Sequence, residues 1–147
     1  MKSTGFSASF STSLSAITNG VYRTPPEVAL LQAAVRRAGL RWTVVDLQRA
    51  RGKRALLNAF ARGFLFPEPF GGNWDALADC LQDLSWLAEP GTVALLRGGA
   101  DFAVAASDEH AVLLEILGAT AEYWRQRDRV FITLSDGATG LPAFPAR

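Results

Sequence analysis

Short apolar runs alternate with segments of helical periodicity along this chain, and this alternation limits the possible folds more than any other feature. The strand-like runs, rich in β-branched residues, are RWTVVDL, TVALLR and RVFITLS, which begin at Arg41, Thr92 and Arg129. Apolar residues recur at helical spacing over residues 52–63, 73–87 and 107–126. Strands that are separated by helices pair in parallel through right-handed crossovers. We therefore expect an α/β protein with a small three-stranded parallel sheet and packed helices, and a Gly- and Ala-rich loop at residues 98–106.

An extension precedes this pattern. Residues 1–20 contain nine Ser or Thr and one charged side chain, which predicts a polar arm. Residues 25–38 form a helical pattern that opens with two prolines. The expected organisation is an N-terminal extension over residues 1–40, an α/β domain over residues 41–135 and a C-terminal tail over residues 136–147.

The composition excludes several classes of protein. Hydrophobic residues make up 49% of the 147 residues, which is typical of a globular protein. Cys80 is the only cysteine, so an internal disulfide and a cysteine-based zinc site are excluded. No run reaches the roughly 18 apolar residues that a membrane span needs, and we expect no membrane partner.

The formal net charge of +1 hides a strong segregation of charge. Residues 21–63 carry nine basic and two acidic side chains, whereas residues 64–96 carry five acidic and no basic ones. The basic segment could form a nucleic-acid patch, with the candidates Arg36, Arg37, Arg41, Arg49, Arg51, Lys53 and Arg54. Because these side chains are spread over three predicted elements, a solvated surface is the favoured interpretation. We expect no direct binding of nucleic acid.

The acidic segment predicts a helix over Asn73–Leu87 with two different faces. Asp75, Asp79 and Asp83 are spaced at i, i+4 and i+8 on the face opposite the apolar arc, and Trp86 falls in the same stripe. Asp75 alone could simply complement the helix dipole. Three aspartates beside an exposed tryptophan indicate instead a surface that attracts a basic partner. Trp86 is the candidate anchor of that interface, because tryptophan is enriched among the residues that dominate binding energy.

These residues belong to a recognisable motif. The stretch FPEPFGGNWDALADCLQDLSW, residues 66–86, resembles the signature of the barstar family, intracellular inhibitors of secreted guanyl-preferring ribonucleases. The order of elements over about residues 41–135 fits the same family. The resemblance implies a barstar-like fold, in which the loop and helix of this motif plug the cationic active site of a small basic ribonuclease. The two aspartates of the motif then stand in for substrate phosphates.

The resemblance also implies which residues contact the partner. Asp75 and Asp79 match the two key aspartates of the family, and Gly71 and Asn73 match its loop. The remaining expected contacts are Phe70, Gly72, Asp83 and Trp86. The chain has Pro69 and Ala78 where the resemblance leads us to expect a tyrosine and a tryptophan. A glutamate of the next helix also has no direct counterpart, and Glu122 is the nearest acidic residue, one turn later.

Other chemistry has weaker support in the sequence. Cys80 lies at the edge of the apolar arc with no base nearby, which favours a structural thiol. His110 is the only histidine, and the local sequence indicates no serine–histidine or cysteine–histidine pairing for catalysis. Asp75 and Asp79 could form an acid/base pair of a hydrolase, and the row of aspartates could bind a divalent cation, but one straight helix suits neither role.

We therefore expect a non-enzymatic immunity protein of the cytoplasm, without cofactor or metal, that protects the producing cell from the ribonuclease. The alternatives are a barstar-like adapter for another basic protein and, less favoured, an acid/base hydrolase.

Overall fold

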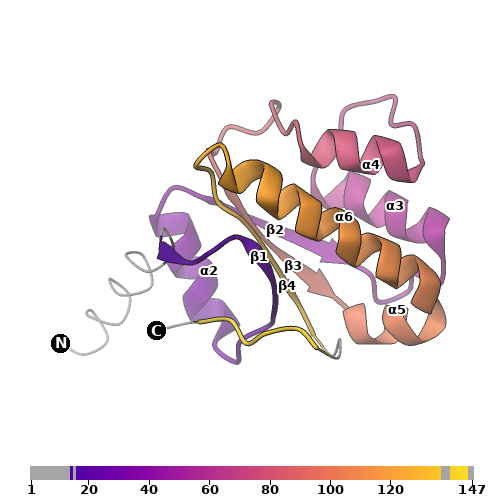
Figure 1. The fold of residues 1–147 in the computed structure, drawn as a ribbon, viewed down its shortest axis with the longest axis horizontal. Coiled ribbons are helices and arrows are strands. Elements are labelled where there is room, and N and C mark those ends of the chain that lie inside the picture. The colour runs from indigo at the N-terminus through magenta and orange to yellow at the C-terminus, as the bar shows by residue number, and fades with distance from the viewer. Residues whose placement is uncertain (1–13, 15, 137–139, 146–147) are drawn as a thin grey trace.

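The protein, described here from a computed structural model, is a parallel α/β sheet covered by helices on both faces (Figure 1). The structure describes residue 14, residues 16–136 and residues 140–145. Four strands pair in parallel in the order β1-β4-β3-β2. Their bounds are β1 (Gly20–Arg23), β2 (Arg41–Asp46), β3 (Thr92–Arg97) and β4 (Phe131–Ser135). The expected parallel α/β class is confirmed, and the expected number of three strands is wrong.

The fourth strand is β1, which comes from the segment that we assigned to the N-terminal extension. It pairs with the buried strand β4, with Gly20 opposite Ile132 and Arg23 opposite Ser135. GVYR is only four residues long and is followed closely by two prolines, so it is too short to show a strand period of its own. Its place in the sheet depends on pairing with a segment more than 100 residues away.

Helices pack against both faces of the sheet. Figure 1 shows α2 on one side and the other helices on the opposite side. The helices are α2 (Val28–Arg37), α3 (Lys53–Gly63), α4 (Trp74–Leu81), α5 (Gly99–Ala105) and α6 (Ser107–Arg125). Alternate residues of β3 enter different cores: Val93 packs with α2, whereas Ala94 and Leu96 pack with α3, α4 and α6. Such burial on both faces explains why TVALLR is a continuous apolar run.

Helices α2 and α5 differ from the sequence-based expectation, as does the end of α4 described below. Helix α2 begins at Val28, three residues after the expected start. Helix α5 occupies the segment that we expected to be a loop. Its first two backbone N–H groups, of Gly99 and Ala100, donate to Oδ1 of Asp136 at 3.0 and 3.3 Å. Because the capping residue lies after β4, the sequence around α5 contains no capping signal. The prediction of a loop over this Gly- and Ala-rich segment is therefore wrong.

The extension is tied to the domain by Asn19, which lies just before β1. Its amide Nδ2 donates to the carbonyls of Ala121 and Arg129, at 3.2 and 2.8 Å. Its Oδ1 accepts a hydrogen bond from the backbone N–H of Phe131 at 2.9 Å. Most of the expected polar arm, residues 1–13 and 15, lies outside the described residues.

Part of the tail returns to the sheet edge, on the α2 side. Phe144 is buried and meets the ring of Tyr22 edge-on at 5.6 Å. An isolated bridge joins Arg23 and Ala143. Of the helices in the described residues, none is long and apolar enough to cross a membrane.

Candidate functional site

The loop Phe66–Gly72 and helix α4 place the candidate residues on one side of the molecule. Asn73 begins the helix: its backbone is extended, and its Oδ1 accepts a hydrogen bond from the N–H of Ala76 at 2.7 Å. This bond satisfies one of the first four helical N–H groups, which have no partner within the helix. Asp75 follows in the first turn, and Asp79 lies one turn later. Both carboxylates are exposed.

Two glycines allow the backbone of the loop to pass close to the first turn of α4. A Cβ on Gly71 would lie 3.2 Å from the Cβ of Ala76, tighter than usual packing allows. Gly72 has a φ of +71°, in the left-handed region that favours glycine. Phe70 is half-buried, and its ring packs 5.0 Å from that of Phe66, which is itself 8% exposed. Phe70 thus anchors the loop to the core and leaves Gly71, Gly72 and Asn73 exposed.

Helix α4 ends at Leu81, six residues before the expected end, so the prediction of one helix to Leu87 is wrong. Leu84 has a φ of +54°, which an α-helix cannot contain. Asp83 therefore lies in a turn, where its Oδ1 accepts a hydrogen bond from the N–H of Ser85 at 3.3 Å. The i, i+4 spacing holds for Asp75 and Asp79, and Asp83 is exposed next to them rather than on the same helix.

Trp86 also lies outside the helix, contrary to the expected stripe. Its Nε1–H donates to the carbonyl of Phe64 at 2.9 Å. Its half-buried ring meets Phe66 edge-on at 5.9 Å. Trp86 therefore ties the turn after α4 to the residues that lead into the loop, and its contact with a partner remains a prediction.

Among the described residues, no basic side chain forms an ion pair with Asp75, Asp79 or Asp83. The ion pairs there join Arg41 to Glu89 at 3.2 Å and Arg125 to Glu122 at 2.6 Å. Lys53 lies near the start of α4, with its Nζ 5.7 Å from the centroid of the Trp74 ring. We call the surface formed by Gly71, Gly72, Asn73, Asp75, Asp79 and Asp83 the acidic face.

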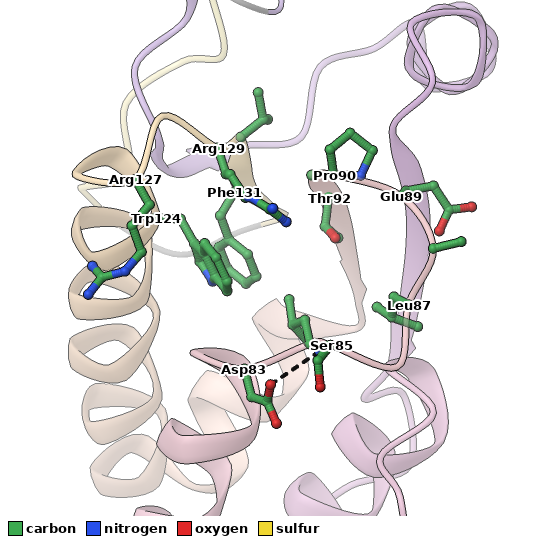
Figure 2. Close-up of a pocket in the computed structure, with 14 residues that line it drawn as sticks. Asp83, Ser85, Leu87, Glu89, Pro90, Thr92, Trp124, Arg127, Arg129 and Phe131 are labelled. Atoms are coloured by element: carbon green, nitrogen blue, oxygen red, sulfur yellow. Dashed lines mark hydrogen bonds between the residues drawn. The ribbon is translucent and has the colours of Figure 1, made fainter.

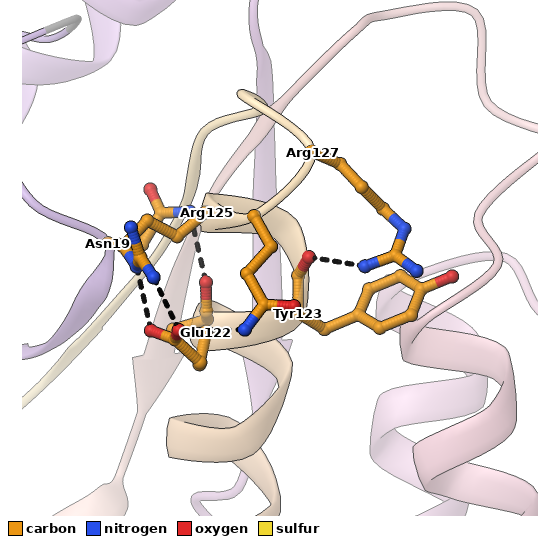
Figure 3. A network of polar contacts seen from close by, with 7 residues as sticks. Asn19, Glu122, Tyr123, Arg125 and Arg127 are labelled. Atoms are coloured by element: carbon orange, nitrogen blue, oxygen red, sulfur yellow. Dashed lines mark hydrogen bonds and ion pairs between the residues drawn. The ribbon is translucent and has the colours of Figure 1, made fainter.

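The carboxylate of Glu122 is bonded to side chains at the end of its own helix, α6. Figure 3 shows its carboxylate beside the guanidinium group of Arg125. Both Arg125 and Gln126 donate to it, at 2.6 and 3.1 Å. The hydrogen bond from Arg125, followed by that from Gln126, lowers the pKa of Glu122 to about 2. This carboxylate is already paired, unlike those of the acidic face.

A pocket of about 590 Å³ adjoins the acidic face at Asp83 (Figure 2). It lies between the segment after α4 and the turn that joins α6 to β4, with Trp124 and Phe131 at its base. Arg127 and Arg129 line the pocket from the turn after α6, and Asp83 and Glu89 line it from the segment after α4, so charges of both signs face the pocket. The pocket could not be predicted from the sequence, because its two walls are about 40 residues apart along the chain. We interpret it as the boundary of the acidic face.

The other reactive side chains do not assemble a catalytic site. Burial, followed by the charges of Asp83 and Asp79, raises the pKa of the Cys80 thiol, which disfavours the nucleophilic thiolate. His110 is 8% exposed beside Phe102, and burial lowers its pKa. In the part of the chain that the structure describes, no three His, Cys, Asp or Glu side chains lie close enough together to hold a metal ion.

The comparison with protein families decides the assignment. The model of the family described as Barstar (barnase inhibitor) matches residues 40–136, more than half of the chain. The chain belongs to the barstar family. This is a family of inhibitors rather than enzymes, and the match includes the loop, α4 and three of the four strands. Strand β1 and helix α2 lie before the matched region. A search of curated proteins found no match.

Proposed function

We propose that this barstar-family protein inhibits a barnase-type ribonuclease by covering its cationic active site with the acidic face. The observation that carries the proposal is the exposed pair Asp75 and Asp79, which makes no ion pair among the described residues and lies in the matched region. In the complex, these carboxylates take the positions of substrate phosphates and pair with Arg, Lys or His side chains of the enzyme. Charge-assisted hydrogen bonds of this kind are about twice as strong as neutral ones.

The loop gives the helix its access to the enzyme. Gly71 and Gly72 carry no side chain, so a partner backbone can approach the start of α4 closely. Asn73 fixes the first turn of the helix, which sets the direction of the Asp75 carboxylate. Phe70 and Trp86 hold the loop and the turn after α4 against Phe66, and we expect both to contact the enzyme at the edge of the acidic face.

The biological role that follows is protection of the cell that makes the ribonuclease. An inhibitor of this kind acts in the cytoplasm, binds the enzyme stoichiometrically and needs no cofactor. The negative charge of the acidic face also raises the rate of association with a basic partner, and salt weakens this effect.

The test is inhibition and titration calorimetry with a barnase-type ribonuclease. The double variant Asp75→Asn/Asp79→Asn is compared with Asp101→Asn/Asp108→Asn, which removes two exposed carboxylates from the first turns of α5 and α6. We expect the first variant to lose inhibition and the second to retain it. Equal affinity of both variants would contradict the proposed face. Tight capture of the enzyme without inhibition would favour an adapter, and hydrolytic turnover that either aspartate substitution abolishes would favour an enzyme.

A further inference from the structure

Five basic side chains gather on the loop that follows β2 and on α3. They are exposed and lie within fourteen consecutive positions, at Arg49, Arg51, Lys53, Arg54 and Arg62. Other bases of the basic segment lie elsewhere: Arg36 and Arg37 are on α2, which covers the opposite face of the sheet, and Arg41 is paired with Glu89. The cluster is therefore a local feature of one surface.

A groove of about 350 Å³ runs between this loop and α3. Arg49 and Gln48 line it from the loop, and Asn58 and Arg62 line it from the helix. A second hollow of about 170 Å³ continues along strand β2 past Val44 and shares Asp46 and Arg62 with the first. We call the two hollows together the basic groove. It lies beside β2, the edge strand of the sheet, with lining residues from Val44 and Asp46 of that strand.

The charge inside the basic groove is unbalanced. Asp46 is its one acidic lining residue, and its Oδ1 accepts a hydrogen bond from the backbone N–H of Gln48 at 3.0 Å. Across the described residues, no ion pair includes any of the five basic side chains of this surface. Guanidinium groups donate only, and their planar fork fits the oxygens of a phosphate. Gln48 and Asn58 add amide donors on both walls.

We propose that the basic groove binds the phosphodiester backbone of a single nucleic-acid strand. A groove with an arginine on each wall can contact successive phosphates of one strand. The aromatic side chains of α3 and the residue after it, Phe60 and Phe64, are fully buried, so the groove has no surface on which bases stack. Binding is therefore independent of sequence and sensitive to salt. The sequence favoured a merely solvated surface, whereas the fold brings Arg49 and Arg62 into one groove.

This binding is separate from the proposed inhibition, because the basic groove contains no residue of the acidic face. The experiment uses the full chain without ribonuclease and a fluorescent oligo(U) of about 16 nucleotides, followed by anisotropy over a range of salt concentrations. We expect a Kd of about 10⁻⁴ to 10⁻⁶ M at physiological salt, typical of nonspecific contacts. Oligo(dT) of the same length should bind equally well, since only phosphates are contacted.

The decisive comparison is between two variants that each remove two arginines. Arg49→Gln/Arg62→Gln should reduce the slope of log K against log salt by about 1.4, because each lost phosphate contact on a single strand contributes about 0.7. At about 0.05 M salt, this corresponds to a Kd that is about sixty-fold weaker. Arg36→Gln/Arg37→Gln, on the last turn of α2, changes the net charge equally and should leave the slope unchanged.

Three results would overturn the proposal. The first is no binding by the wild-type chain, with circular dichroism showing that the chain is folded. The second is an equal loss in both variants, which would mean that net charge alone drives the interaction. The third is displacement of the labelled strand by a poly-glutamate peptide of matched charge as effectively as by unlabelled oligonucleotide. This result would make an acidic protein the ligand of the groove.

Discussion

The indole N–H of Trp124 donates a hydrogen bond of 2.8 Å to the backbone carbonyl of Leu81, the last residue of α4. The last four carbonyls of a helix have no partner within it, and this bond satisfies one of them from α6. Trp124 is 9% exposed, so the bond is shielded from water. It fixes the end of α4, and with it the position of Asp79, relative to the core.

The substitution Trp124→Phe should destabilise the protein by about 1–3 kcal/mol, because it leaves the Leu81 carbonyl buried without a donor. Urea unfolding measures the loss. Trp86→Phe is the matched control, since Trp86 also donates to a carbonyl but is only half-buried. We expect the smaller loss there, and equal losses would contradict the role given to Trp124.

Replacing the residue that caps α4 tests the start of the same helix. Asn73→Ala should lower the free energy of unfolding by about 1 kcal/mol, because the N–H of Ala76 loses its acceptor. Asn73→Asp keeps an acceptor and adds a charge that suits the helix N-terminus, so its stability should stay near that of the wild type. Asn58→Ala, at an exposed position inside α3, should be neutral or slightly stabilising. A loss in the Asp variant as large as in the Ala variant would refute the capping role.

The features that were predicted correctly from the sequence have local causes. The runs at Thr92 and Arg129 are apolar because β3 and β4 are buried, and the run at Arg41 belongs to the half-buried edge strand β2. Helices α3 and α6 follow their periodicity closely. The start of α4 was also predictable, because a capping asparagine precedes an apolar pattern. The motif that marks the barstar family lies over this same start.

The features that were missed depend on distant partners. Strand β1 exists through its pairing with β4, and α5 is capped by Asp136. The early end of α4 coincides with the contact to Trp124, whereas the apolar spacing of the sequence continues toward Leu87. As a result, the pattern placed Asp83 and Trp86 on a helix that the tertiary structure does not extend to them.

Asn19 offers a test of how the extension is attached. Its side chain bonds to three backbone groups, so Asn19→Ala should cost about 2–3 kcal/mol of stability in urea unfolding. Amides of β1 should also exchange faster with deuterium. Thr18→Ala, an exposed neighbour, should change neither quantity. If β1 amides keep their protection in Asn19→Ala, the attachment depends on other contacts.

The single histidine predicts a specific response to pH. Burial lowers the pKa of His110 from 6.5, so the unfolded chain binds a proton more readily than the folded chain. The unfolding free energy should therefore fall as the pH decreases below about 6.5, by at most about 1.4 kcal/mol per pH unit. NMR titration of the one histidine gives its pKa directly, and His110→Gln should flatten the profile just below about pH 6.5. A pKa at or above 6.5 would contradict the prediction.

The three aspartates of the acidic face should contribute unequally to binding of a barnase-type ribonuclease. Asp75 and Asp79 project from α4, whereas Asp83 lies in the following turn and accepts from the N–H of Ser85. Asp75→Asn and Asp79→Asn should each weaken the Kd at least tenfold, which is about 1.4 kcal/mol. Asp83→Asn should weaken it less than tenfold, because its carboxylate already accepts a hydrogen bond and shares the neighbouring pocket with Arg127 and Arg129. Surface plasmon resonance at two salt concentrations measures the Kd of each variant and separates association from dissociation. An effect of Asp83→Asn equal to that of Asp79→Asn would extend the interface past the end of α4 and over the pocket at Arg127 and Arg129.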